Sequence, residues 1–286
     1  MLRRFSGNLK SAPQLSPAAV NSFPRRAPVA VDEQRTSLRL LTYNMQVGIK
    51  SCAFRHYLTR SWQHLLPHSR HMDNLDSIAA MLTDFDIVAL QEADGGSIRS
   101  GHLNQVRYLA EMAGFPCWYQ QLNRNLGKFA QHSNGVLSRL EPDLIEDHKL
   151  PGFLPGRGAI FLRYGCGDDF LIFVALHLSL GHRAQTYQLA YIRELISDYK
   201  HVVVMGDLNS CSEQILQLSP LSEIKLQCPK GIYNTYPSWQ PVAGLDHILV
   251  SPSLYIKCAE VVPYALSDHL PVALEIELPS EALATH

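Results

Sequence analysis

The sequence predicts an α/β protein in which two β-sheets pack face to face and helices cover their outer surfaces. Three observations support this fold class. Runs of apolar, often β-branched residues recur along the chain and are typical of strands buried on both faces. Segments with apolar residues three and four apart alternate with them, as in helices that lie on a sheet. Several neighbouring strands are joined by short turns, which favours mixed or antiparallel pairing over a purely parallel sheet.

Composition narrows the class of protein. The chain has 286 residues, 46% of them apolar, which is enough for one large domain with a substantial core. A formal net charge of -1 gives no overall attraction to nucleic acid or an anionic membrane, although a local basic patch is compatible with it. The six cysteines have no zinc-type spacing and indicate ordinary thiols in a reducing compartment. No run approaches the ~18 apolar residues that span a bilayer. We therefore expect a cytoplasmic protein without a stably inserted membrane segment.

The N-terminal residues 1–36 differ from the rest of the chain. They are rich in Ser, Pro and Arg, show no hydrophobic periodicity, and are expected to be disordered. They lack the apolar segment of a secretory signal, but they contain no acidic residue before Asp32, a composition that overlaps with organelle transit peptides. Organelle targeting is the less favoured alternative to a plain tail. We expect residues 37–286 to form one domain, because no repeat or composition break divides them.

Nine strands and three helices are expected. The strands share a continuous or alternating apolar pattern; they are Leu38–Tyr43, Asp86–Leu90, Cys117–Gln121, Asn134–Ser138, Ala159–Tyr164, Phe170–Leu176, the run from Val202 to Gly206, His247–Val250 and Pro271–Leu278. The helices share apolar spacings of three and four; they are Met72–Phe85, Val106–Ala113 and Ala184–Tyr199. Gly114 is the expected C-cap of the second helix. We expect a loop-rich stretch after the run from Val202, extending through Trp239.

Polar residues of types that act in catalysis or metal binding lie at the ends of these strands. Asp207 and Asn209 lie two apart beyond Gly206, so in an extended chain their side chains would point to one side. The others are Asn44, Glu92, His177, Asp246, Asp268 and His269. Each alone could merely cap a turn or make a structural hydrogen bond. Carboxylates gathered at one place repel each other and normally require a cation. A set of Asn, Asp and Glu oxygens suits Mg²⁺ or Mn²⁺ better than zinc.

The motifs that contain these residues resemble the endonuclease/exonuclease/phosphatase superfamily, which has a deoxyribonuclease-I-like fold. They match in order and spacing: Thr42-Tyr43-Asn44, Leu90-Gln91-Glu92, Asn134-Gly135-Val136-Leu137-Ser138-Arg139, His177-Leu178, Gly206-Asp207-Leu208-Asn209, Leu245-Asp246-His247-Ile248 and Ser267-Asp268-His269-Leu270-Pro271. The resemblance covers Leu38 to Leu278, and the Gly-Asp-x-Asn and Ser-Asp-His-x-Pro signatures are specific in combination. It implies a four-layered α/β sandwich of two stacked mixed sheets, with the site at one edge.

The resemblance also implies roles for the metal-binding and acid residues. Glu92 would be the principal metal ligand, with Asn44 and Asp268 coordinating or orienting nearby. His269 would pair with Asp246, which fixes the tautomer of the imidazole and favours its charged form beside the scissile phosphate.

The remaining roles and the branch follow in the same way. Asp207 would orient or deprotonate the attacking water, while Asn209 and His177 would bind phosphoryl oxygens. Two residues after Asn44 the abasic-site endonuclease branch has an acidic residue, whereas this chain has Gln46; that branch also usually has Tyr in place of His177. Both features resemble the deoxyribonuclease, sphingomyelinase and phosphatase branches instead.

The sequence predicts the chemistry more sharply than the substrate. Arg99 and Arg157 follow glycines in loops and could grip a second phosphate or simply be solvated charges. The insertion Lys50 to His71, with Trp62, could be a lid over the site or a surface excursion. We expect a Mg²⁺-dependent phosphodiesterase or phosphatase acting on a small or lipid-derived phosphate ester. The alternatives are a nuclease on DNA or RNA, which would need a local basic groove, and a non-catalytic binding protein on the same scaffold.

Overall fold

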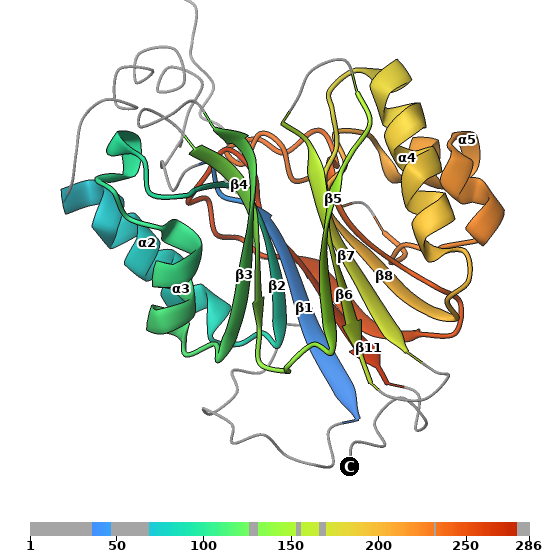
Figure 1. Ribbon diagram of the computed structural model, residues 1–286, viewed down its shortest axis with the longest axis horizontal. Coiled ribbons are helices and arrows are strands. Elements are labelled where there is room, and N and C mark those ends of the chain that lie inside the picture. Colours follow the sequence, from blue (N-terminus) through green and yellow to red (C-terminus); the bar gives the residue numbers. More distant parts are fainter. Residues whose placement is uncertain are drawn as a thin grey trace, which may run out of the picture.

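Two sheets lie face to face between two layers of helices (Figure 1). The computed structural model describes residues 36–46, 69–125, 131–152, 156–165, 170–231 and 233–278. Helices α2 and α3 cover the outer face of one sheet, and α4 and α5 cover the outer face of the other. This arrangement confirms the predicted four-layered α/β sandwich. Among the described residues, no helix is long and apolar enough to cross a membrane.

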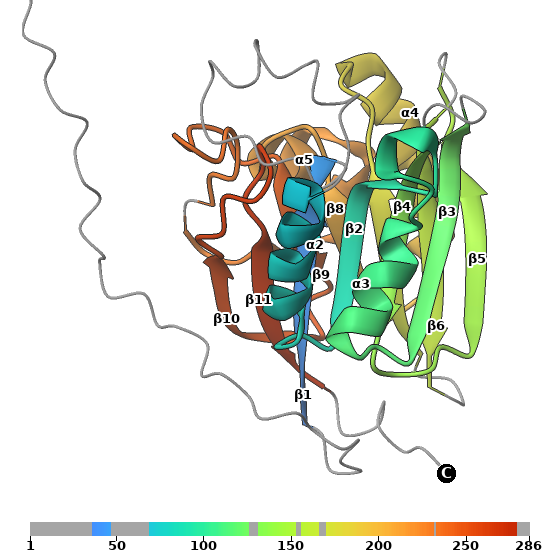
Figure 2. The same ribbon diagram turned by 90° about the vertical axis from the view of Figure 1, so that its left-hand side faces the viewer.

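The first sheet has six strands in the order β10-β11-β1-β2-β4-β3. Their bounds are β1 Ser37–Asn44, β2 Ile87–Asp94, β3 Cys117–Asn125, β4 Gln131–Ser138, β10 Tyr255–Val261 and β11 Val272–Glu277. Strands β1 and β2 are parallel and the other neighbours are antiparallel. Helices α2 (Ser69–Leu82) and α3 (Gln105–Ala113) lie side by side across its outer face (Figure 2). Gly114 caps α3 in a left-handed conformation, as expected.

The second sheet has five strands in the order β5-β6-β7-β8-β9. Their bounds are β5 Leu144–Lys149, β6 Gly158–Tyr164, β7 Leu171–His177, β8 His201–Asp207 and β9 Asp246–Val250. In this sheet only β7 and β8 pair in parallel, and the helix α4 (His182–Ile196) connects them. Helix α5 (Ser212–Leu218) and the short 3₁₀ helix η4 (Pro220–Ile224) follow β8. Both sheets are therefore mixed, as the short connections predict.

The core explains why the inner strands are mostly apolar on both faces. Leu38 and Leu40 of β1 point between the sheets, where they join Phe173 and Met205 of the second sheet. Tyr43 and the residues that point to the same, outer face of β1 pack against α2 and α3 instead. A strand covered by a sheet on one face and helices on the other has no face left for polar residues. The apolar runs end where the strands reach the edge of the sandwich.

Some elements were missed, and some predictions cannot be assessed. Strand β5 carries mostly exposed side chains and β10 mostly half-buried ones, so neither shows the apolar pattern of a buried strand. The expectation of a loop-rich stretch through Trp239 is wrong in part, since α5 and η4 lie within it. Of the predicted tail 1–36, residues 1–35 lie outside the described residues, as do residues 50–68 of the Lys50 to His71 insertion. The last three residues of that insertion begin α2.

Candidate active site

Strand pairing brings three of the predicted site residues into one row. His177 at the end of β7 lies opposite Asp207 at the end of β8, and Asp207 lies opposite Asp246 at the start of β9. In the first sheet, Asn44 ends β1 and pairs with Gln91 of β2. The structure thus places these residues at one edge of each sheet, where loops can hold polar groups that the core would exclude.

Asp207 joins the two sheets through a polar contact at the candidate site. Its Oδ2 accepts a hydrogen bond from Nδ2 of Asn44 at 2.9 Å and lies 3.4 Å from Nε2 of His177. Its Oδ1 accepts the backbone N–H of Asn209 at 2.9 Å. Burial and the charge of Asp246 raise the pKa of Asp207 to about 7, although His269 and these hydrogen bonds act in the opposite direction. The carboxyl group therefore exchanges its proton near neutral pH.

Asn209 does not lie in the predicted geometry. Its backbone is left-handed, with φ of 48°, so the chain turns sharply after Asp207 and the expected extended conformation is wrong. The side chain turns back toward the previous strand, where Nδ2 donates to the carbonyl oxygen of Leu178 at 3.0 Å. Asn tolerates this conformation better than most residues because its short polar side chain can bond locally. Asn209 remains beside Asp207, but it is held there by the turn.

His269 and Asp246 form the predicted pair. Nδ1 of His269 lies 2.7 Å from Oδ2 of Asp246, and both side chains are buried. Burial lowers the pKa of His269, but the charge and hydrogen bond of Asp246, together with the charges of Asp207 and Asp268, outweigh it and raise this pKa to about 10. The imidazole is therefore protonated at neutral pH and presents a positive charge to the site.

His177 differs from His269 in its charge. Burial lowers its pKa well below the ordinary value, and nearby Arg157, His269 and His132 lower it further. It is therefore a neutral ring that can share a hydrogen bond at Nε2. The two histidines predicted for the site thus have opposite protonation states, set by their neighbours.

Two of the predicted metal-binding residues, Glu92 and Asp268, lie close enough for their charges to interact. Glu92 lies in a β-bulge of β2, where the register shifts between Leu90 and Ala93, and its φ is 56°. A bulge re-aims a side chain, and the left-handed backbone turns Glu92 out of the regular sheet pattern. Burial raises the pKa of Asp268 to about 6; His269 lowers it, and Glu92 adds to the rise. A carboxyl group whose pKa is raised by a neighbouring carboxylate is a suitable ligand for a cation.

A second group of donors also satisfies the geometry of a metal site. One ligand atom each of Asp207, Asp246 and His269 lies within 4.8 Å of the others, so these three could hold a metal ion. However, His269 is already hydrogen bonded to Asp246 and protonated at neutral pH, so its ring has no lone pair to donate. The carboxylates Glu92 and Asp268, with the amide oxygen of Asn44, fit a hard divalent cation better.

Arg157 is the second cation of the site. Its side chain is half-buried, and burial lowers its pKa while the charges of Glu92 and Asp207 act to raise it. It follows Gly156, which has φ of 114°, and precedes Gly158, where an added Cβ would lie 2.2 Å from Oε1 of Gln121. The loop therefore needs both glycines to bring Arg157 to the carboxylates. The side chain of Arg99 lies outside the described part of the chain.

Several residues that sequence reasoning missed support the His269 pair. Oγ1 of Thr235 donates to Oδ2 of Asp246 at 2.5 Å. The ring of Tyr236 lies against His269, with centroids 4.9 Å apart. Oγ of Ser267 donates to the carbonyl oxygen of Asn44 at 2.6 Å and accepts the N–H of His269 at 3.0 Å. Ser267 belongs to the Ser-Asp-His-x-Pro motif, so its position directly before Asp268 could have indicated a role in the site. Thr235 lies in a loop, and no sequence pattern pointed to it.

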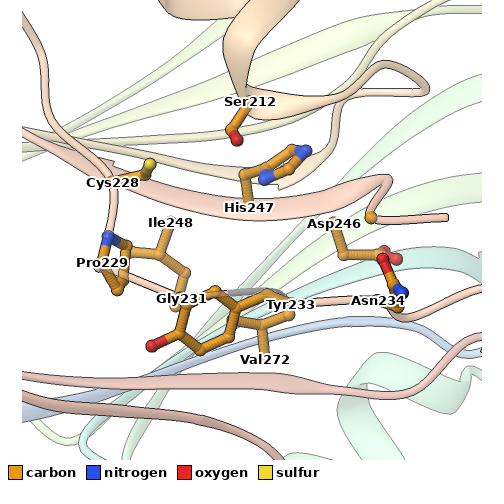
Figure 3. Close-up of a pocket in the computed structure, with 11 residues that line it drawn as sticks. Ser212, Cys228, Pro229, Gly231, Tyr233, Asn234, Asp246, His247, Ile248 and Val272 are labelled. Atoms are coloured by element: carbon orange, nitrogen blue, oxygen red, sulfur yellow. The ribbon is translucent and has the colours of Figure 1, made fainter.

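A cavity of about 220 Å³ lies next to Asp246 (Figure 3). Tyr233 and His247 line it, and the side chain of Asn234 lies beside that of Asp246 at one end. Oδ1 of Asp246 is buried and makes no hydrogen bond within the described residues. The space is large enough for water, which would satisfy this oxygen.

The family and fold can now be stated from comparisons with known proteins. The profile of the Endonuclease/Exonuclease/phosphatase family matches residues 41–269, a span that includes all the site residues above. No curated protein sequence matches the chain significantly.

Solved structures share the fold at low sequence identity. An endonuclease/exonuclease/phosphatase from Beutenbergia cavernae has a TM-score of 0.64 and 20% identity over 86% of this chain and 73% of its own. A mannosyl-6-phosphatase from Bacteroides thetaiotaomicron has a TM-score of 0.60 and 19% identity, covering 84% of this chain and 100% of its own. ANGEL2, described as a 2′,3′-cyclic phosphatase, has a TM-score of 0.59 and 13% identity, covering 84% and 95%. With the family profile and the arrangement of the site, the protein belongs to the endonuclease/exonuclease/phosphatase family.

Proposed function

We propose that the protein is a divalent-metal-dependent hydrolase of phosphate esters, in which water attacks phosphorus in line. The observation that carries this proposal is the position of Asp207. One ligand atom of its carboxylate lies within 4.8 Å of a ring nitrogen of the protonated His269, and Oδ2 accepts a hydrogen bond from Asn44, a proposed metal-binding residue. Hydrolysis of a phosphate ester needs a base for water, positive charge for the phosphoryl oxygens and fixed hydrogen-bond donors.

The metal half of the site consists of Glu92, Asp268 and Asn44. These residues would hold Mg²⁺ or Mn²⁺, since their donors are oxygens and the charge of Glu92 adds to the rise in the pKa of Asp268, which a cation would offset. The bound ion would supply positive charge that neutralises the phosphoryl oxygens. Oδ1 of Asn44 accepts the N–H of Gln46 at 3.2 Å, which fixes the amide so that Nδ2 points to Asp207.

The other site residues have separate proposed roles in catalysis and phosphate binding. Asp207 orients the attacking water and accepts its proton, and a pKa near 7 suits a general base at neutral pH. His269, held by Asp246, places a positive charge where negative charge grows on the phosphoryl group. His177, Asn209 and Arg157 are proposed to contact the phosphoryl oxygens, Arg157 as the second cation. Arg99 is proposed to bind a second phosphate.

A small or lipid-derived phosphate ester is the proposed substrate class. The net charge of -1 gives no long-range attraction to a polyanion, and two proteins of the same fold are described as a mannosyl-6-phosphatase and a 2′,3′-cyclic phosphatase. A nuclease is the alternative and would show a steep loss of binding with added salt. We further propose that residues 37–286 form the catalytic domain and that it works in the cytoplasm.

The proposal is tested by a panel of phosphate esters. Purified protein is incubated with Mg²⁺ or Mn²⁺ and bis-p-nitrophenyl phosphate, p-nitrophenyl phosphate, sphingomyelin, plasmid DNA or RNA. We expect turnover of a small ester that chelation of the metal abolishes. Asp207→Asn and His269→Ala should each lower the rate by about 10² to 10⁴, while Asp198→Asn, at an exposed carboxylate, should not. Absence of turnover with either metal, or full activity of both site variants, would contradict the proposal.

A further inference from the structure

Helix α4 carries two glutamines on its buried face. Gln185 is 4% exposed and Gln188 is 1% exposed, although the helix lies on the outside of the second sheet. Figure 1 shows α4 running along the strands β7 and β8, which end at His177 and Asp207. A buried amide requires hydrogen-bond partners, because an unpaired one costs free energy. The partners of these two side chains are therefore informative.

The amide of Gln185 joins two loops of the candidate site. Its Nε2 lies 2.8 Å from the carbonyl oxygen of Ser179, 3.0 Å from that of Asn209 and 3.4 Å from that of Leu208. Ser179 lies two residues after His177, and Asn209 lies two residues after Asp207. One side chain thus fixes the chain beyond both strand ends at once.

Asn209 depends on such contacts because of its backbone. A left-handed φ of 48° is adopted by few non-glycine residues and persists only when the surroundings over-determine it. Its N–H donates to Asp207, its Nδ2 donates to the carbonyl oxygen of Leu178, and its carbonyl oxygen accepts from Gln185. The first two contacts lie within the site. Only the third comes from α4, which is anchored in the core by Leu189 and its neighbours.

We propose that Gln185 is a positioning residue of the phosphoesterase site. It fixes Asn209 in its left-handed turn and thereby fixes the Asp207 carboxylate relative to His177. This inference rests on the proposed function. Gln188 provides a contrast, because its Oε1 accepts the N–H of Ser179 at 2.9 Å and its Nε2 donates to Oγ of Ser179 at 2.9 Å. Within the described part of the chain, no hydrogen bond of Gln188 reaches the turn at Asn209.

The test compares Gln185→Met with Gln188→Met in the full chain. Methionine keeps the length and flexibility of glutamine but donates no hydrogen bond. Both variants should unfold at a lower temperature than the wild type. Gln185→Met should lower kcat at least about tenfold while KM changes less than about twofold, because small displacements of reacting groups reduce the rate strongly. Gln188→Met should keep kcat within about twofold of the wild type, as expected for loss of packing alone. Bis-p-nitrophenyl phosphate with Mg²⁺ serves as substrate.

Hydrogen–deuterium exchange gives a second readout that needs no turnover. The segment 205–211 should exchange faster in Gln185→Met and at the wild-type rate in Gln188→Met. If Gln185→Met does not fold, Gln185→Asn keeps an amide but withdraws it by one methylene, and the same pattern is expected with a smaller loss. Equal losses of kcat in the Gln185 and Gln188 variants, or unchanged exchange of segment 205–211, would overturn the inference. A wild type without hydrolysis would overturn the proposed function, while the exchange result would still decide the role of Gln185.

Discussion

Replacing Asp246 by Asn tests how the site keeps His269 charged. The charge and the hydrogen bond of Asp246 are the two largest influences that raise the pKa of His269 to about 10 against the effect of burial. The substitution would remove the charge and keep the shape of the side chain. The pKa of His269 should then fall toward the ordinary value of about 6.5.

The size of the effect follows from these two pKa values. At pH 8 a group with a pKa of about 10 is almost fully protonated, whereas one with a pKa of about 6.5 is only about 3% protonated. The rate of Asp246→Asn at pH 8 should therefore fall by up to about thirtyfold. The loss should shrink as the pH is lowered toward 6, because the ring regains its charge. In the wild type, His269 should cause no change in rate between pH 6 and pH 9.

Two assays measure this change. Rates with bis-p-nitrophenyl phosphate between pH 5.5 and pH 9 should give a profile for Asp246→Asn that declines above about pH 6.5. NMR titration of the His269 ring should report its pKa directly. The raised pKa of His269 also makes folding stability depend on pH. The stabilisation of the folded state is fully present below pH 6.5 and is lost as the pH rises through about 10. The variant should lack this loss. A His269 pKa near that of the wild type in Asp246→Asn would refute the reasoning.

Three further predictions concern the supports of the site. Thr235→Val removes the hydroxyl that donates to Asp246, the carboxylate partner of His269. The variant should lower kcat with bis-p-nitrophenyl phosphate roughly tenfold, because a hydrogen bond to a charged group contributes ~1.5–3 kcal/mol. Thr235→Ser should restore the rate in the same assay. Gly206→Ala should lower the melting temperature sharply, because its Cβ would lie 1.9 Å from a carbonyl oxygen of β7, whereas Gly181→Ala, with open space around its Cβ, should be neutral or stabilising. The raised pKa of Asp268 means that stability without metal falls as the pH rises from about 4 to about 6. Mg²⁺ should therefore raise the melting temperature more at pH 8 than at pH 5, and Glu92→Gln should abolish this difference. If the difference between pH 8 and pH 5 were as large in Glu92→Gln as in the wild type, the metal assignment would be contradicted.

The sequence predicts the centre of the fold well because burial leaves a clear pattern. Strands such as β1 and β8 are covered on both faces, so they read as apolar runs that stop at Asn44 and Asp207. Strand β5 is an edge strand with exposed, charged side chains, and its pattern resembles that of a loop. Edge strands are held by backbone hydrogen bonds, which leave no trace in the side-chain sequence.

The same physical reason separates the predicted from the missed site residues. The predicted residues lie at strand ends, which the apolar pattern locates. On α4 the aromatic side chain of Tyr187 is 57% exposed, whereas Gln185 and Gln188 are buried in line with Leu189. A buried polar residue at helical spacing from the core positions was the available signal. Its partners lie in loops distant in sequence, and only the structure identifies them.

The source of the oxygen in the product tests the central claim most directly. Hydrolysis of bis-p-nitrophenyl phosphate is run with Mg²⁺ in water enriched in ¹⁸O, and the phosphoryl product is analysed by mass spectrometry. If the site activates water to attack phosphorus, the p-nitrophenyl phosphate released should contain one ¹⁸O atom and the p-nitrophenol none, and Asp207→Asn should form both products about 10² to 10⁴ times more slowly. Label in the p-nitrophenol, or no Mg²⁺-dependent product from the wild type, would contradict the account.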